Sequence, residues 1–331
     1  MGLFKKIYFF IVCLCLVVAS TAQTKYESPI NWKQSGVLPV QPNGLIHMGL
    51  SGVVSGLVGD QIIIAGGNNF PEGLPWEGGI KKYYKRVIVY NNQKDTLLNT
   101  FTFNLPANVA YAAVAQLKDG IFYAGGENEN GPLSSAYLIK KSKSQSFEII
   151  ELPSLPIAIS NAVAVATENA VYVLGGANKE GISNKVWKLA LNNIKKGWTV
   201  QASLPQPTSF AAAAIANEHI YIMGGRCKEA NGISKIYKEV YAFNVENNFW
   251  EQKASLPETV SAACALAIGN GKILFIGGDK GVVFHEVEML TSKIAATNDL
   301  VVKNNLVTIK NKLQQIEITL FGNMTRLETV F

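Results

Sequence analysis

The sequence predicts an all-β fold in which repeated four-stranded sheets are arranged as a β-propeller. A double glycine follows a short apolar run five times, and successive pairs are 59, 50, 49 and 53 residues apart. Repeats of about 50 residues are typical of kelch-type propellers. A single Gly-Gly carries little information, whereas five in register indicate a repeat. The pairs are Gly66-Gly67, Gly125-Gly126, Gly175-Gly176, Gly224-Gly225 and Gly277-Gly278.

Each double glycine lies within the same succession of strand signals. A small apolar run precedes the glycine-ending strand, as in residues 110–119 and 209–218. An alternating segment follows each of the first four pairs, and a further strand then ends in Leu-Pro, as at Leu152-Pro153. Four short strands separated by turn residues constitute a propeller blade. We therefore predict a six-bladed kelch β-propeller over residues 23–331, from about 50 residues per blade.

The two ends of the chain are predicted to meet in one blade. Trp198 and Trp250 each precede a Leu-Pro pair by six residues, and Trp32 precedes Leu38-Pro39 by the same six. Residues 31–39 thus resemble an outermost strand whose other three strands are not upstream. The C-terminal segment must supply them, which would close the ring and remove its open edges.

The first 22 residues are expected to be a cleaved export signal. Lys5 and Lys6 precede an apolar run of about a dozen residues, and small residues lead to a cleavage site after Ala22. A membrane anchor is the alternative, but the run is short for a bilayer span. We expect a periplasmic or secreted protein that is not held in a membrane after cleavage. Its oligomeric state stays open.

The mature chain offers little charge and few cysteines. Removal of two signal lysines lowers the net charge from +6 to +4, and the basic residues form no block, so nucleic acid binding is not expected. Cys227 and Cys264 alone remain after cleavage. Cys264 lies in a small apolar run and is predicted to be a packed thiol, although a disulfide between the two stays open.

A binding site is expected on the rim where each first strand begins and each second strand ends. The loop between Gly67 and Arg86 holds 18 residues, whereas the corresponding loops of the next two repeats hold about eight. Its aromatic rings, amides, acids and lysines suit a sugar acid. The alternative is a loop that folds over the rim around its own small core of Phe70 and Trp76.

Four polar residues follow other double glycines and are expected on the same rim: Glu127, Asn178, Arg226 and Asp279. Arg226 is the most informative of them, because a fixed guanidinium can bind a carboxylate through two hydrogen bonds. The alternative for Arg226 is a salt bridge between neighbouring loops. Lys81 and Lys82 are equally compatible with solvated loop charges.

Residues 46–49, 64–71 and 75–84 (IHMG, IAGGNNFP and PWEGGIKKYY) resemble the hallmark of the N-acetylneuraminate epimerases, specifically their cyclically permuted mutarotase branch. The similarity covers roughly residues 30–285. It implies an exported enzyme that interconverts the anomers of sialic acid by ring opening and closure, without a cofactor or metal. We expect the substrate-binding residues to be Asn68, Asn69, Phe70, Trp76, Glu77, Lys82, Tyr83, Glu127 and Arg226.

The C-terminal segment departs from that family. The resemblance implies a catalytic glutamate after a Gly-Glu strand ending, with an arginine six residues later. No Gly-Glu strand ending and no arginine at that spacing follow Gly278, and Glu317, Arg326 and Glu328 match no motif. The tail, from about residue 285 to 331, is polar and lacks blade punctuation, so no catalytic residue is assigned. A sialic acid mutarotase remains the favoured function. The alternatives are a non-catalytic module that binds a glycan or protein, and an inactivated, truncated family member. Copper chemistry of the galactose oxidase type lacks its Tyr, Cys and His ligand set.

Overall fold

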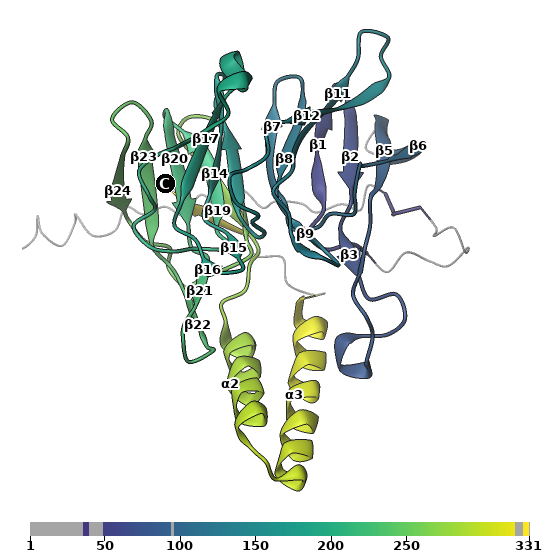
Figure 1. Cartoon of the computed structure of the whole chain (residues 1–331), viewed down its shortest axis with the longest axis vertical. Helices are drawn as coiled ribbons and strands as arrows, with labels where there is room; N and C mark the ends of the chain where they lie inside the picture. The colour runs from purple at the N-terminus through teal and green to yellow at the C-terminus, as the bar shows by residue number, and fades with distance from the viewer. Residues whose placement is uncertain (1–35, 40–48, 94–95, 322–326, 331) are drawn as a thin grey trace, which may run out of the picture. The chain divides into compact units, whose positions relative to one another are not determined.

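The structure, a computed structural model, describes residues 36–39, 49–93, 96–321 and 327–330 of the 331-residue chain. Five antiparallel sheets follow one another along the described chain (Figure 1). Each of the first four has four strands in the order of the sequence, and the fifth has three. The predicted all-β repeat is therefore confirmed for five successive sheets.

The strand bounds agree with the predicted repeat. The first sheet contains β1 (Val54–Val58), β2 (Gln61–Ala65), β5 (Arg86–Gln93) and β6 (Thr96–Asn104). The second contains β7 (Ala113–Leu117), β8 (Gly120–Ala124), β11 (Ala136–Lys141) and β12 (Phe147–Leu152). The third contains β13 (Val163–Ala166), β14 (Ala170–Leu174), β17 (Val186–Ala190) and β18 (Trp198–Val200), with the 3-10 segment η2 (Leu191–Lys196). The fourth contains β19 (Ala212–Ala216), β20 (His219–Met223), β23 (Val240–Asn244) and β24 (Phe249–Lys253).

A small two-stranded ladder leaves each of these four sheets between its second and third main strands. These ladders form the rim loops. They are β3 (Asn68–Asn69) with β4 (Lys82–Tyr83), β9 (Glu127–Asn128) with β10 (Gly131–Pro132), β15 (Ala177–Asn178) with β16 (Gly181–Ile182), and β21 (Arg226–Lys228) with β22 (Ser234–Ile236).

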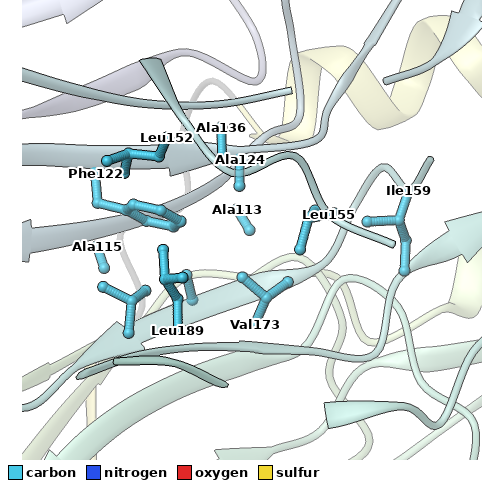
Figure 2. Close-up of a cluster of buried hydrophobic side chains, with 12 residues drawn as sticks. Ala113, Ala115, Phe122, Ala124, Ala136, Leu152, Leu155, Ile159, Val173 and Leu189 are labelled. Atoms are coloured by element: carbon cyan, nitrogen blue, oxygen red, sulfur yellow. The ribbon is translucent and has the colours of Figure 1, made fainter. Parts of the chain in front are cut away.

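The hydrophobic core lies between successive sheets. Phe122 from the second sheet lies opposite Leu189 and Val173 from the third, with Leu152 beside it (Figure 2). Similar buried clusters join the first sheet to the second, the third to the fourth, and the fourth to the fifth. Each pair of successive sheets thus buries apolar side chains between its members, and this burial stabilises the stack of repeats.

The first glycine of each pair permits this close packing. A Cβ on Gly66 would lie 2.4 Å from the carbonyl oxygen of Val109, and one on Gly224 would lie 2.3 Å from that of Val260. Both glycines also have positive φ, a region that L-residues rarely adopt. The fifth pair differs, because none of the described atoms lies within 4 Å of the Cβ position of Gly277.

The tail is mostly helical, which the sequence did not indicate. Helices α2 (Val282–Ala296) and α3 (Leu300–Phe321) pack together, and β27 (Leu327–Val330) then pairs with β26 (Ile273–Ile276). The fifth sheet is therefore β25 (Cys264–Ala267), β26 and β27. The Asp299 carboxylate accepts hydrogen bonds from the Val301 and Val302 amides and caps α3. The tail lacks the double glycine and Leu-Pro motifs of the repeat because the chain is helical there.

The prediction that Cys264 is packed was wrong. Its side chain is exposed, as are Leu266 (60%) on β25 and Ile268 (50%) directly after that strand. No sixth sheet covers this face of β25 within the described part of the chain, and burial in this fold comes from the neighbouring sheet. Both Cys227 and Cys264 are free thiols.

The predicted export signal, residues 1–22, lies outside the described residues, as do residues 31–35 of the predicted closing strand. Of that strand, Val37 accepts a hydrogen bond at its carbonyl oxygen from the Tyr90 hydroxyl, at 3.0 Å. Among the described helices, none combines the length and apolar character needed to traverse a bilayer.

Candidate functional site

The expected rim exists at the point where each first strand is entered and each second strand is left. In each repeat, a residue in the segment that leads into the first strand forms a β-bridge with the residue that directly follows the double glycine. The partners exchange two backbone hydrogen bonds, as between Ser51 and Asn68, each at 2.9 Å. The pairs are Ser51–Asn68, Ala110–Glu127, Ser160–Ala177, Ser209–Arg226 and Ser261–Asp279. Glu127, Arg226 and Asp279 therefore occupy equivalent positions on one rim.

A backbone chain links the five repeats just inside these pairs. Gly52, Tyr111, Asn161, Phe210 and Ala262 all have φ between 53° and 66°. The amide of each residue after Gly52 donates to the carbonyl oxygen of the preceding member, at 2.8 to 3.0 Å. Left-handed backbone at four non-glycine residues is costly, and such residues gather at functional sites. The side chains of this chain of residues thus start from fixed points on the rim.

Two residues predicted to bind substrate, Asn68 and Asn69, make side-chain hydrogen bonds that stabilise the long loop. Asn68 is 2% exposed, and its Nδ2 donates to the Ser51 carbonyl oxygen at 3.1 Å. Asn69 donates from Nδ2 to the Gly49 carbonyl oxygen and accepts from the Tyr84 hydroxyl at 2.7 Å. Both amides therefore stabilise the entry to the rim, and their expected role in substrate binding stays a prediction.

The tip of the loop matches the alternative of a small local core only in part. Phe70 and Trp76 are half-buried, and the Trp76 Nε1 is buried without a partner among the described residues. Trp76 and Glu77 lie in the short 3-10 segment η1 (Pro75–Glu77), where the Glu77 carboxylate accepts from the Leu74 amide at 2.8 Å. Glu77 and Lys82 are exposed.

Tyr83, Glu127 and Lys81 form the first polar cluster of the rim. The Tyr83 hydroxyl donates to the Glu127 carboxylate at 2.7 Å, and the Lys81 Nζ lies 3.5 Å from the same oxygen. The Lys81 ammonium also lies over the ring of Tyr111, 5.5 Å from its centroid. Burial, followed by the hydrogen bond to Glu127, raises the pKa of Tyr83, so its phenol stays protonated at neutral pH. This cluster combines a carboxylate with two proton donors.

Arg226 forms the second cluster, stacked between aromatic rings. Its guanidinium carbon lies 4.1 Å from the ring centroid of Phe210 and 4.3 Å from that of Phe284 in α2. Burial lowers the pKa of Arg226, while the charges of Glu288 and Asp279 oppose that shift. The predicted alternative, a salt bridge between loops, is not observed: no carboxylate of the described residues lies within 4 Å of this guanidinium.

An aromatic contact connects the two clusters, since the Tyr111 and Phe210 rings meet edge to face with centroids 6.4 Å apart. The structure thus brings Tyr83, Glu127 and Arg226 onto one connected surface. Asn178 serves a turn, accepting from the Glu180 and Gly181 amides, and Asp279 accepts from the Gly281 amide.

Sequence reasoning did not select Tyr111, Phe210 or Phe284. The repeat did contain a signal for the first two. A small residue lies 17 positions before the residue that follows each of these double glycines, as Ala110 does before Glu127, and Tyr111 and Phe210 directly follow these small residues. Nothing in the repeat pointed to Phe284, since it belongs to a helix outside the repeat. Within the described residues, no three His, Cys, Asp or Glu side chains gather as metal ligands.

Comparison with known families supports the same relationship. Residues 152–316 match the family model of N-acetylneuraminate epimerase. The Kelch-like protein terF of Aspergillus terreus is 28% identical over 303 residues, which cover 86% of this chain and 62% of terF. The N-acetylneuraminate epimerase of Vibrio vulnificus is 32% identical over 131 residues, and N-acetylneuraminate epimerase 1 of Escherichia coli is 26% identical over 151 residues.

The chain spans only part of these relatives: 33% of the Vibrio enzyme and 40% of the Escherichia coli enzyme, from 38% and 44% of its own length. The solved structure of YjhT superimposes with a TM-score of 0.59 at 15% identity, covering 73% of this chain and 79% of YjhT. That likeness concerns the fold alone and agrees with a propeller-like arrangement. The all-β kelch repeat, the family model over residues 152–316 and the curated relatives together show that the chain is similar to the N-acetylneuraminate epimerases.

Proposed function

We propose that this protein is a sialic acid mutarotase, an isomerase that interconverts the anomers of N-acetylneuraminate. The observation that carries the proposal is the arrangement of two clusters on the rim. The Glu127 carboxylate lies beside two proton donors, and the contact between the Tyr111 and Phe210 rings joins this cluster to the stacked Arg226. Sialic acid presents a carboxylate on its anomeric carbon, so one bound molecule needs both a cation and acid–base groups close together. The names of the relatives support the same substrate.

In the proposed mechanism, the Arg226 guanidinium binds the substrate carboxylate through its in-plane N–H groups. The Glu127 carboxylate removes the proton of the anomeric hydroxyl, and the Lys81 ammonium donates a proton to the ring oxygen as the carbon–oxygen bond breaks. The resulting ketone turns its other face, and the ring oxygen attacks it. The two protons then return, so Glu127 and Lys81 end as they began. Tyr83 holds Glu127 in place through its hydroxyl.

A non-catalytic glycan-binding module is the second candidate. The absence of the family's Gly-Glu strand ending after Gly278 favours it, because the glutamate and arginine implied by the resemblance have no counterpart there. The rim surface could then bind a sugar acid without changing it, since Arg226 and the aromatic rings suffice for recognition.

Anomer exchange measured by NMR separates these candidates. We expect the purified protein to accelerate conversion of freshly released α-N-acetylneuraminate, and Glu127→Gln to lower kcat by about 100-fold or more, as general base catalysis contributes that much. Glu129→Gln is the matched control, because Glu129 is a carboxylate of the same loop that contacts Asn108 instead. A wild-type rate equal to that of buffer would exclude the enzyme.

We also propose that a sixth blade closes the ring, with residues 31–39 as its outermost strand. The Tyr90–Val37 hydrogen bond and the uncovered face of β25 support this arrangement. An exported location, periplasmic or secreted, is likewise part of the proposal and is supported by the amino-terminal residues 1–22. Mass spectrometry of the mature amino terminus tests it: cleavage after Ala22 is the expected result.

A further inference from the structure

Helix α2 is attached to the rim ladder that carries Arg226. The Glu288 carboxylate accepts from the backbone amide and the hydroxyl of Ser234, at 2.7 and 2.8 Å. The His285 Nε2 donates to the Ser234 carbonyl oxygen at 2.6 Å. Ser234 begins β22, which pairs with β21, and Arg226 begins β21. Three hydrogen bonds thus fix α2 against the strand opposite Arg226.

This attachment places Phe284 on one face of the Arg226 guanidinium, with Phe210 near by at 4.1 Å from the guanidinium carbon. Ring contacts of this kind engage the face of the planar group and leave its in-plane N–H donors for a ligand. Stacking also restricts the rotation of a side chain that is otherwise flexible, so less conformational entropy is lost when an anion binds.

The two carboxylates whose charges raise the pKa of Arg226 accept hydrogen bonds from other donors. Glu288 accepts from Ser234, and the Asp279 Oδ1 accepts from the Gly281 amide at 2.7 Å. Neither lies within ion-pair distance of the guanidinium in the described structure. The Arg226 side chain is therefore partly buried and oriented, yet no carboxylate in the described part of the chain contacts its guanidinium. A bound carboxylate would provide that contact.

We propose that the amino-terminal half of α2 is a wall of the substrate site and that Phe284 is a positioning residue for Arg226. This inference rests on the proposed function in its choice of ligand, a sugar acid carboxylate. It adds a component that the β repeat does not supply: a helix outside the repeat that holds the anion-binding arginine in a fixed orientation.

The first measurement follows the NMR signals of the Arg226 side chain in the full-length protein. Ring currents from Phe284 are expected to shift these signals, and Phe284→Leu is expected to remove part of that shift while keeping apolar bulk. Phe284→Tyr keeps the ring and should restore the shift. Val282→Ala is the control on the same helix, since Val282 is 69% exposed. Equal Arg226 signals in wild type and Phe284→Leu would overturn the inference.

The second measurement uses two carboxylate probes. These are acetate and the methyl α-glycoside of N-acetylneuraminate, which cannot change its anomeric form. We expect both to move the Arg226 signals, and Phe284→Leu to weaken glycoside binding by about tenfold, the equivalent of a cation–π contact of about 1.4 kcal/mol. The methyl ester of the glycoside should bind wild type and Phe284→Leu equally weakly. In turnover, Phe284→Leu should raise KM more than it lowers kcat.

The outcomes separate this inference from the proposed function. If acetate moves the Arg226 signals in a Phe284-dependent way but the glycoside does not bind, the choice of sialic acid fails and the helical wall stands. If the glycoside binds but the protein does not accelerate anomer exchange of free N-acetylneuraminate, the enzyme fails and the wall stands. If neither probe affects Arg226, or if Phe284→Leu binds the glycoside as wild type does, the inference is wrong.

Discussion

The fourth and fifth repeats both have a double glycine after their second strand, but their first strands differ greatly in burial. On β19, Ala212, Ala214 and Ala216 are 3%, 5% and 7% exposed, because the fifth sheet covers them. The equivalent positions in the fifth repeat are Cys264 and Leu266 on β25 and Ile268 directly after it, and all three are exposed. A Cβ on Gly224 would likewise meet the Val260 carbonyl oxygen of the next repeat, whereas a Cβ on Gly277 would lie within 4 Å of none of the described atoms.

This difference shows that a strand sequence specifies its sheet but not the burial of that sheet. The fifth repeat carries Cys264, Leu266 and Ile268 where the fourth carries alanine, so its exposed face has larger side chains than the equivalent face of the fourth. Exposed apolar positions in a row mark a surface that is expected to be covered. The proposed sixth blade can be tested by equivalent substitutions on β19 and β25. If that blade covers β25, the two substitutions should destabilise the protein by similar amounts.

The largest contrast is expected from a buried charge. Ala214→Asp should destabilise the protein by about 3–5 kcal/mol, because the carboxylate would be enclosed without a partner. Leu266→Asp should cost less than about 0.5 kcal/mol if β25 is open to solvent. Urea unfolding of the two variants measures both values. A similar loss for both would mean that another sheet covers β25, which would support the proposed closure.

The glycine pair gives the next contrast. Gly224→Ala should cost about 3 kcal/mol or more, since a left-handed backbone is combined with overlap against the Val260 carbonyl oxygen. Gly277→Ala shares the positive φ but meets no described atom, so a cost of about 1 kcal/mol is expected. Thermal and urea unfolding compare the two. Equal losses would place a neighbour against Gly277.

The smallest contrast concerns the hydrogen bonds between neighbouring segments. The Trp250 Nε1 donates to the Ala202 carbonyl oxygen at 2.9 Å, and the Tyr90 hydroxyl donates to that of Val37 at 3.0 Å. Trp250→Phe should cost about 2 kcal/mol, which includes lost packing, and Tyr90→Phe about 1 kcal/mol. If Tyr90→Phe has no effect, the segment before Leu38-Pro39 does not dock on the first sheet in solution.

Much of the fold could be predicted because its signals are local and repeated. The double glycines, the alternating strands and the Leu-Pro endings each reflect the geometry of one blade, and together they placed five sheets. The helices α2 and α3 could not be predicted in the same way, since expectations for the tail were derived from the repeat that it leaves. Cys264 was misjudged because its small apolar neighbours resemble a buried strand, while burial depends on the next sheet.

The candidate site was predictable in its location and less so in its chemistry. Position after a double glycine correctly placed Glu127 and Arg226 on the rim. The hydrogen bonds of Asn68 and Asn69 to the protein could not be predicted, because an amide binds backbone and sugar hydroxyls equally well. Their binding role stays a prediction. Phe284 lies 58 residues beyond Arg226 in the sequence, and only packing of α2 brings the two together.

The linked left-handed residues at the rim use their backbone to hold the repeats together, which leaves their side chains available to contact a ligand. Their backbone amides and carbonyls hold one another, so the position of each Cα depends little on the side chain attached to it. Tyrosine, asparagine, phenylalanine and alanine already occupy these positions in one chain. Such a framework lets ligand preference change through single substitutions while the scaffold keeps its geometry, which makes positions 111, 161, 210 and 262 suitable sites for redesigning selectivity.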